Sequence, residues 1–192
     1  MKIDIKKYFK RLQNLFDEIE ATSDSGKRCD FEVAIKSVIK MIKEKAKRGG
    51  KLIFIGNGAS AAISSHMAVD FWKNGRIRAM SFNDADLLTC VSNDYGYEHV
   101  FEKPIEMFVE PNDILFAISS SGKSKNVLSG VAMAKKKKAE VVTLSGFDKG
   151  NPLRKLGKVN FYVPYSSYGY VETVHQAICH CLVDMIVEKK NG

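Results

Sequence analysis

Hydrophobic residues recur every three or four positions in the first 50 residues of this chain, and this spacing predicts two helices. The apolar residues of the first expected helix are Ile5, Phe9, Leu12, Phe16 and Ile19. The second helix is expected at residues 31–47, where Gly49 and Gly50 would end it. Both helices precede the predicted sheet and have no obvious place in it, so we expect them to pack against another subunit.

From residue 52 onward the apolar residues gather in short runs that alternate with helical patterns. Five of these runs are expected to be strands: residues 52–55, 77–82, 114–118, 141–144 and 161–163. A long helical pattern follows at residues 170–189. Strands that alternate with helices form parallel sheets covered on both faces. The sequence therefore predicts an α/β fold, a three-layer sandwich with a five-stranded parallel sheet. Residues 1–192 would form a single domain, with 1–50 as a helical extension and 51–192 as the core.

Two loops rich in glycine or serine follow predicted strands, at residues 56–60 and 119–124. The carboxyl ends of parallel strands meet at one edge of a sheet, where ligands bind. We therefore expect the two loops to lie close together. The second loop offers four hydroxyls, from Ser119, Ser120, Ser121 and Ser124, just before a helix begins near residue 126. Free N–H groups at a helix start bind anions, so this loop is predicted to hold a phosphomonoester.

Two other phosphate-binding patterns compete with this interpretation. Residues 117–124 come close to a Walker A loop, with Lys123 and Ser124 as possible phosphate and magnesium ligands. However, Ala117 replaces the first glycine, and the next strand is followed by serine and glycine rather than an acid. Residues 56–61 also fit the dinucleotide pattern GxGxxA, with Asp84 near the end of the second strand as a candidate ribose ligand.

Histidines and carboxylates occur on the helices that follow the first loop and end the chain. His66 and Asp70 are four residues apart and share a helix face, whereas Glu172, His175 and His180 lie on the last helix. These are ligand types of zinc and related metals. Glu172 and His180 would be about 12 Å apart on one regular helix. They can bind one metal only if Glu172 precedes that helix or if another subunit supplies one of them.

The composition is that of an ordinary soluble protein, with 45% hydrophobic residues and a net charge of +8. The lysines lie mainly on predicted helix surfaces without interleaved aromatic residues, so we expect a solvated basic face and no nucleic-acid partner. No apolar run reaches the roughly 20 residues that span a bilayer, so we expect no membrane association. The four cysteines show no pairing pattern and are expected to be reduced thiols in a cytoplasmic protein.

Four segments together resemble one known family. They are residues 56–66 (GNGASAAISSH), 89–101 (TCVSNDYGYEHVF), 118–127 (ISSSGKSKNV) and 171–180 (VETVHQAICH). Their order and spacing are similar to those of the phosphoheptose isomerases, single-domain sugar isomerase (SIS) proteins with a flavodoxin-like fold. The resemblance covers about residues 51–188. It implies conversion of sedoheptulose 7-phosphate to D-glycero-D-manno-heptose 7-phosphate for nucleotide-activated heptose synthesis, which serves lipopolysaccharide or capsule. It also implies a homotetramer with active sites at subunit interfaces.

The resemblance also implies roles for particular residues. The sugar would contact Asn57, Gly58, Ala59, Asp70, Asn93, Asp94 and Glu172, with Asn93 and Asp94 in a loop. The phosphate would contact Ser119, Ser120, Ser121 and Ser124, and Lys123 would be a bystander. Zinc would be bound by His66, Asp70, Glu172 and His180, of which Asp70 and His180 would also be the catalytic acid–base pair.

Three positions depart from the family pattern. Asp70 stands where the family has glutamate, which withdraws the carboxylate by about 1.5 Å. Glu172 replaces a glutamine and adds a negative charge, and Ala59 replaces a glycine. These departures can indicate a different sugar-phosphate substrate. Alternatively, Asp70 and Glu172 can compensate for each other, since both remain oxygen ligands. Some SIS relatives bind sugar phosphates without catalysis, as regulators or adaptors. Because acids and histidines remain at all four metal positions, we expect an enzyme.

Overall fold

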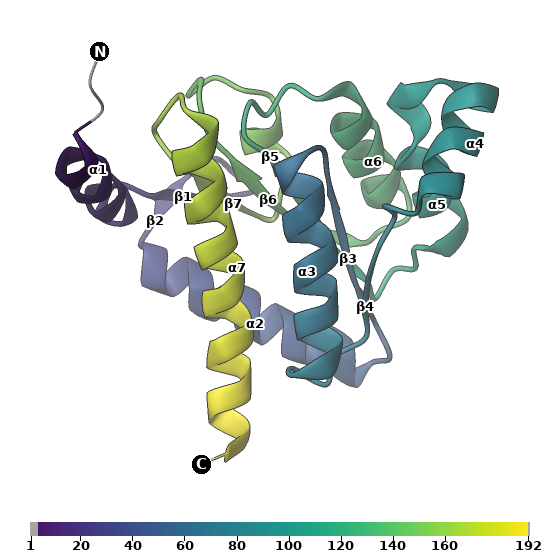
Figure 1. Ribbon diagram of the computed structural model, residues 1–192. Coiled ribbons are helices and arrows are strands. Elements are labelled where there is room, and N and C mark those ends of the chain that lie inside the picture. Colours follow the sequence, from purple (N-terminus) through teal and green to yellow (C-terminus); the bar gives the residue numbers. More distant parts are fainter. Residues whose placement is uncertain (1–3, 192) are drawn as a thin grey trace.

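A seven-stranded, mostly parallel sheet forms the middle layer of the molecule (Figure 1). The computed structural model describes residues 4–191, and the side chains of residues 4–188. The strands are β1 (Glu20–Ser23), β2 (Arg28–Cys29), β3 (Leu52–Gly56), β4 (Ala79–Ser81), β5 (Ile114–Ser119), β6 (Glu140–Ser145) and β7 (Val159–Tyr162). Their order is β2-β1-β7-β6-β5-β3-β4. Strands β3 to β7 run parallel to one another and correspond to the five apolar runs of the sequence.

The predicted strand number of five is wrong, because a hairpin extends the sheet by two antiparallel strands. β1 and β2 come from the stretch between the first two helices, and β1 pairs with β7. Hydrophobic patterning did not reveal this hairpin because it is mostly polar. It is held instead by the sheet edge and by side chains, including an ion pair at 2.6 Å between Glu20 and Arg154.

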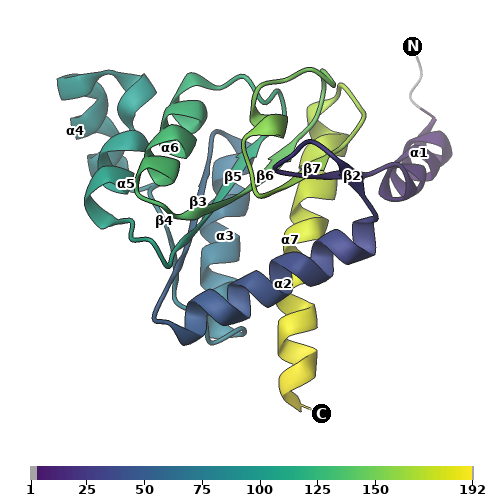
Figure 2. The same ribbon diagram turned by 180° about the vertical axis from the view of Figure 1, so that it is seen from behind.

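Within residues 4–191, seven helices surround the sheet. They are α1 (Ile5–Asp17), α2 (Phe31–Lys47), α3 (Ala59–Lys73), α4 (Ala85–Tyr95), α5 (Glu102–Phe108), α6 (Lys125–Lys136) and α7 (Tyr168–Asn191), with short 3-10 turns η1 (Tyr97–His99) and η2 (Leu153–Lys155). In Figure 1, α3 and α7 run side by side in front of the sheet. The view from behind shows α4, α5 and α6 on the other face (Figure 2). The predicted three layers are therefore confirmed.

Alternating side chains of the central strands build one hydrophobic cluster on each face. Leu52 and Phe54 of β3 pack with residues of α2, α3 and α7, whereas Ile53 and Ile55 pack with residues of α4, α5 and α6. This alternation follows from the two-residue repeat of a strand. Each of these fully buried side chains contributes on the order of 2 kcal/mol. Because both faces are filled, the open edge at the strand carboxyl ends is left for ligands.

The segment of residues 91–94, expected to be a loop, belongs to the last part of helix α4. Leu87, Leu88 and Val91 pack at helical spacing against the cluster formed by α5, α6 and the sheet. This packing explains why the segment is helical despite its polar residues. No helix within residues 4–191 is both long and apolar enough to cross a membrane.

Candidate active site

A cavity of about 250 Å³ lies where the loops after β3 and β5 meet. It is lined by Asn57, Gly58, Ala59, Ser60, Ser119, Ser120, Ser121, Ser124, Tyr168 and Glu172. Helix α3 begins after Gly58 and helix α6 after Ser124, and neither helix start has a side-chain cap. Their free N–H groups are therefore available to an anion. The expected proximity of the two loops is confirmed, because β3 and β5 are adjacent parallel strands.

The four serines of the second loop form a hydroxyl-rich wall, which we call the serine cradle (residues 119–124). The hydroxyls of Ser119 and Ser124 are 3.2 Å apart, and the Ser121 hydroxyl accepts a hydrogen bond from the backbone N–H of Lys123 at 3.2 Å. The Ser120 hydroxyl is buried and finds no hydrogen-bond partner within residues 4–188. A buried polar group without a partner is rare in folded proteins and costs free energy. An oxyanion in the cavity would accept a hydrogen bond from this hydroxyl.

Lys123 turns away from the cavity. Its ammonium group forms an ion pair with Asp148 at 3.0 Å, and the residue is absent from the cavity lining. Among the described residues that line the cavity, none is basic. A nucleotide loop needs its lysine on the phosphates. The arrangement instead offers hydroxyl and backbone donors, which suits a single terminal phosphate.

Asn57 is held in place by two residues that the sequence analysis did not single out. Its amide exchanges hydrogen bonds with the amide of Asn126 at the start of α6, at 2.9 and 2.8 Å. The hydroxyl of Tyr97 also donates to Asn57, at 3.1 Å. Two further cavity residues, Ser60 and Tyr168, were missed as well. Ser60 is next to the predicted Ala59, but Tyr168 reaches the cavity only through the placement of α7.

Glu172 brings the only carboxylate among the residues that line the cavity. It lies near the start of α7 and has no hydrogen-bond partner in the described part of the chain. Burial raises the pKa of its carboxyl group above the ordinary value. A carboxylate at this position would accept hydrogen bonds from the hydroxyls of a bound sugar.

A second constellation lies where α3 passes α7. One Asp70 oxygen is 3.3 Å from Nε2 of His66 and 3.6 Å from Nδ1 of His180, and the two imidazole rings are 5.4 Å apart. One ligand atom from each residue lies within 4.8 Å of the others. Two imidazoles and a carboxylate are a donor set of catalytic zinc sites, which leave a fourth position open. The three side chains therefore fit a zinc ion.

Glu172 does not join this cluster within one copy of the chain. Helix α7 begins at Tyr168, so Glu172 and His180 lie on the same regular helix, about 12 Å apart along its axis. Of the four expected metal ligands, the structure thus gathers His66, Asp70 and His180. The alternative that Glu172 precedes the regular helix is thus wrong, and the supply of Glu172 or His180 by another subunit stays a prediction.

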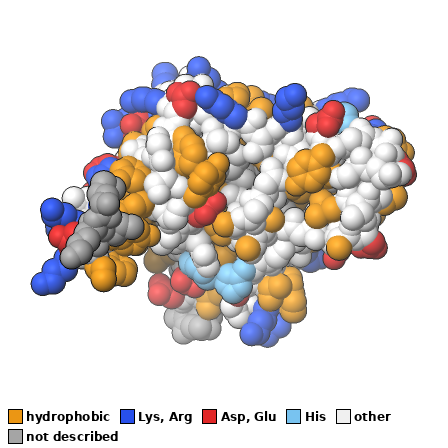
Figure 3. Space-filling model, turned by 45° about the horizontal axis from the view of Figure 1, so that its top comes forward, with side chains coloured by type: hydrophobic (Ala, Val, Ile, Leu, Met, Phe, Trp, Pro, Cys, Tyr) orange, Lys and Arg blue, Asp and Glu red, His pale blue; other side chains and the backbone are white. Residues whose placement is uncertain are grey.

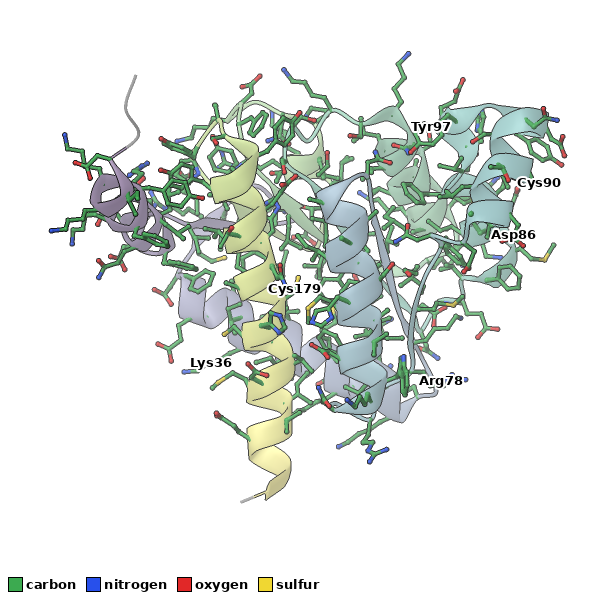
Figure 4. The ribbon with its side chains drawn as sticks, in the orientation of Figure 1. Lys36, Arg78, Asp86, Cys90, Tyr97 and Cys179 are labelled. Carbon is green, nitrogen blue, oxygen red and sulfur yellow. The ribbon has the colours of Figure 1, made fainter. Side chains whose placement is uncertain are left out.

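Two predicted sugar contacts lie elsewhere in the molecule. Asn93 and Asp94 are exposed on α4, hydrogen-bond to each other at 3.0 Å, and are not among the residues that line the cavity. Figure 4 labels Cys90 of the same helix at the end of the molecule away from α7, on which Cys179 is labelled. One copy of the chain therefore does not bring Asn93 and Asp94 to the serine cradle.

His175 does not belong to the cluster of His66, Asp70 and His180. Its ring is fully buried, and Nε2 lies 3.1 Å from the backbone oxygen of Ser145 at the end of β6. Burial lowers the pKa of His175 to about 4, so the ring is neutral at pH 7. His175 is thus a packed core residue that contacts the strand end behind the cavity.

Comparisons with known proteins agree with this architecture. Residues 7–146 match the SIS domain family model. A phosphoheptose isomerase from Haemophilus ducreyi is 36% identical over 160 residues, covering 79% of this chain and 81% of that protein. The structure of a phosphoheptose isomerase from Francisella tularensis has a TM-score of 0.83 at 27% identity, covering 96% of each chain. Phosphoheptose isomerase GmhA from Neisseria gonorrhoeae has a TM-score of 0.81 at 26% identity, covering 95% of this chain and 97% of that chain.

Both kinds of comparison extend well beyond the short motifs of the sequence. The sequence match covers more than two thirds of this chain and of the Haemophilus ducreyi protein, and the structural match covers nearly all of it. The chain belongs to the SIS-domain family and, within it, to the phosphoheptose isomerases, which are sugar-phosphate isomerase enzymes.

Proposed function

We propose that this enzyme converts sedoheptulose 7-phosphate to D-glycero-D-manno-heptose 7-phosphate, for nucleotide-activated heptose synthesis. The observation that carries the proposal is the serine cradle, where the buried Ser120 hydroxyl lacks a partner beside two uncapped helix starts. Ser119, Ser120, Ser121 and Ser124 would donate to the phosphate oxygens. The names of the phosphoheptose isomerase relatives support the choice of sugar.

The remaining cavity residues would hold the carbon chain of the sugar. Asn57, Gly58 and Ala59 lie on the side opposite the serine cradle, at the start of α3, and Glu172 adds a hydrogen-bond acceptor. Hydrogen bonds to several hydroxyls fix the reacting carbons at one place. Asn93 and Asp94 would also contact the sugar; they do not line the cavity themselves, but α4 ends two residues before Tyr97, whose hydroxyl donates to the cavity residue Asn57.

Asp70 and His180 would carry out the proton transfers. Asp70 would remove the proton from C1 of the ketose while His180 donates a proton to the C2 oxygen, which gives an enediol. The reverse exchange, with the proton of the C1 hydroxyl removed and a proton added at C2, gives the aldose. The contact of 3.6 Å between the two side chains lets each compensate the charge that the other acquires. Zinc would be held by His66, Asp70 and His180, and it would polarise the sugar carbonyl.

We further propose that the complete site lies at an interface of a homotetramer. The two helices that carry His66, Asp70 and His180 also carry exposed hydrophobic side chains: Val69 and Trp72 on α3 are 41% and 52% exposed, and Met185 on α7 is 38% exposed. Figure 3 shows histidine side chains beside hydrophobic ones on the surface of the molecule. Packing of copies through α3 and α7 would bring Glu172 of one copy to the cluster of another. The helices of residues 1–50 would add to the contact, since Ile5 and Phe9 are exposed.

Isomerisation in deuterated water tests the proposed reaction. The purified, zinc-loaded protein is incubated with sedoheptulose 7-phosphate, and NMR follows aldose formation and deuterium at C1 and C2. We expect turnover with deuterium incorporation, and we expect Asp70→Asn to abolish both while it still binds the substrate. Substrate binding without turnover in the wild type would identify a non-catalytic SIS protein. Hydrolysis of ATP that depends on Lys123 would instead favour a nucleotidase.

A further inference from the structure

Behind the serine cradle, the side chain of Asn151 is completely buried among backbone groups. Its amide donates to the backbone oxygens of Gly146 and Asp148, at 3.1 and 2.8 Å, and to the hydroxyl of Ser145 at 3.3 Å. Its oxygen accepts the N–H of Arg154 at 3.0 Å. Both polar atoms of the Asn151 side chain therefore form hydrogen bonds, and none of their partners lines the cavity.

Asn151 also fills the space beside Gly122, the turn residue of the serine cradle. A Cβ atom on Gly122 would overlap the Asn151 amide, and Gly122 has a φ of +63° that glycine adopts without strain. The N–H of Leu153, two residues after Asn151, donates to the Gly122 oxygen at 3.2 Å. The loop that carries Asn151 thus holds the turn in the serine cradle by contact and by hydrogen bonding.

A second connection runs through Gly146. The N–H of Gly146 donates to the backbone oxygen of Ser120 at 2.9 Å, while its own oxygen accepts from Asn151. Asn151 is therefore linked to the serine cradle at both Ser120 and Gly122. A small displacement of this side chain would move the residue whose hydroxyl is buried without a partner.

We infer that Asn151 is a positioning residue for phosphate binding, which it serves by fixing the backbone of Ser120 and Gly122. This inference rests on the proposed function, since it requires that the serine cradle holds the phosphate. Asn151 does not touch the cavity, so it acts only through the geometry of the hydroxyl and N–H donors. Loss of this geometry weakens binding of the phosphate group equally in the ground state and in the transition state, because the phosphate is remote from C1 and C2. Such a loss raises KM and leaves kcat nearly unchanged.

The chain offers a matched control in Asn160 on β7. Its side chain is equally buried; it accepts from Thr143 and Gly157 at 2.8 and 2.7 Å and donates to the oxygens of Thr22, Ser23 and Gly157. Asn160 joins the hairpin of β1 and β2 to β7 and does not line the cavity. Replacing it removes five side-chain hydrogen bonds, against four at Asn151, and leaves every contact of the serine cradle in place.

The test compares Asn151→Ala and Asn160→Ala in the zinc-loaded protein. The measurements are kcat and KM for sedoheptulose 7-phosphate, the Kd for inorganic phosphate by calorimetry, and the melting temperature. We expect Asn151→Ala to raise KM and the phosphate Kd at least about ten-fold with kcat within about three-fold. Asn160→Ala should lower the melting temperature by a similar amount, with KM and the phosphate Kd within about two-fold of wild type.

Equal KM and phosphate Kd in the two variants would overturn the role of Asn151 and leave the proposed reaction standing. If Asn151→Ala does not fold, Asn151→Ser and Asn160→Ser give the same comparison, since serine keeps a small donor at each site. Wild-type protein that neither turns over the sugar nor binds phosphate would overturn the proposed function, and the role of Asn151 with it. Turnover by wild type with no effect of either Asn151 variant would overturn the inference alone.

Discussion

Asn57 and Asn126 form a reciprocal pair of amide hydrogen bonds, at 2.9 and 2.8 Å, between the loop after β3 and the start of α6. The pair ties together the two helix starts that face the cavity. Donors that are held in place before a ligand arrives need no reorganisation when it binds. The proposed phosphate site would therefore be preformed in a single copy of the chain.

Replacing Asn126 by alanine should loosen this connection. The Asn57 amide would lose its partner, which is expected to lower the free energy of unfolding by about 1–3 kcal/mol. We expect KM for the sugar phosphate to rise as well, because the two helix starts are no longer held together. Urea unfolding and steady-state kinetics measure the two effects. Tyr97→Phe removes one hydrogen bond to Asn57 and should have a smaller effect on both; a larger one would contradict this assignment.

The buried Ser120 hydroxyl allows a test that separates binding from stability. Ser120→Ala removes an unpaired group, so we expect unchanged or slightly higher thermal stability together with weaker binding of inorganic phosphate. Ser64→Ala is the control, because the Ser64 hydroxyl is also buried but donates to the Ser60 oxygen at 2.8 Å. That variant should lose about 1 kcal/mol of stability and keep its phosphate affinity. A destabilised Ser120→Ala protein with normal affinity would contradict the prediction.

Zinc binding is expected to depend on His66. His66→Ala removes one of three clustered ligands, so zinc content after gel filtration should fall to a small fraction of the wild-type value. His99→Ala serves as the control, because His99 is a partly exposed histidine paired with Glu102 outside the cluster. Elemental analysis decides the outcome. Equal zinc in the two variants would remove His66 from the site.

Assembly through α3 and α7 is expected to be sensitive to charge at Trp72. Trp72→Glu places a carboxylate at an exposed, apolar position of α3, and it should convert the proposed tetramer to smaller species with little activity. Met107→Glu is the control, since Met107 is 74% exposed on α5 on the other face of the sheet. Light scattering with gel filtration measures the mass. A tetrameric, active Trp72→Glu protein would contradict the interfacial site.

Acid should destabilise the protein through His175. Burial lowers its pKa from 6.5 to about 4, so between these values the unfolded chain binds a proton that the folded chain does not. Stability therefore falls as the pH drops through this window, by roughly 3 kcal/mol in total from this residue. Urea unfolding from pH 7 to pH 4 measures the slope. His175→Gln keeps a donor toward Ser145 and should show a smaller pH dependence; identical slopes would refute the assignment.

Much of the site could be predicted from the sequence because its parts are local. The apolar runs before residues 56 and 119 identified two buried strands, and parallel pairing then required their loops to meet. His66 and Asp70 share a helix face by spacing alone. The loop containing Asn151 gave no such signal, because its role depends on contacts with Gly122 and Gly146 that arise only in the folded chain.

Other features depend on tertiary placement that no short motif encodes. His180 meets Asp70 because α3 and α7 are neighbours, although 110 residues separate the two. The hairpin of β1 and β2 has mostly polar residues and is specified by the edge of β7 rather than by hydrophobic spacing. The resemblance implied a loop at Asn93 and Asp94, but the packing of Leu87, Leu88 and Val91 stabilises a helix there.

The hairpin has a consequence for solubility. A long unpaired edge strand can recruit strands of other molecules, and proteins avoid this with short or covered edges. Here β7 is covered by β1, and the sheet ends in strands of two residues at β2 and three at β4. Neither margin offers a useful template for strand addition. Strand addition between folded copies of this chain is therefore disfavoured, and concentrated samples of the folded protein should resist fibre-like aggregation.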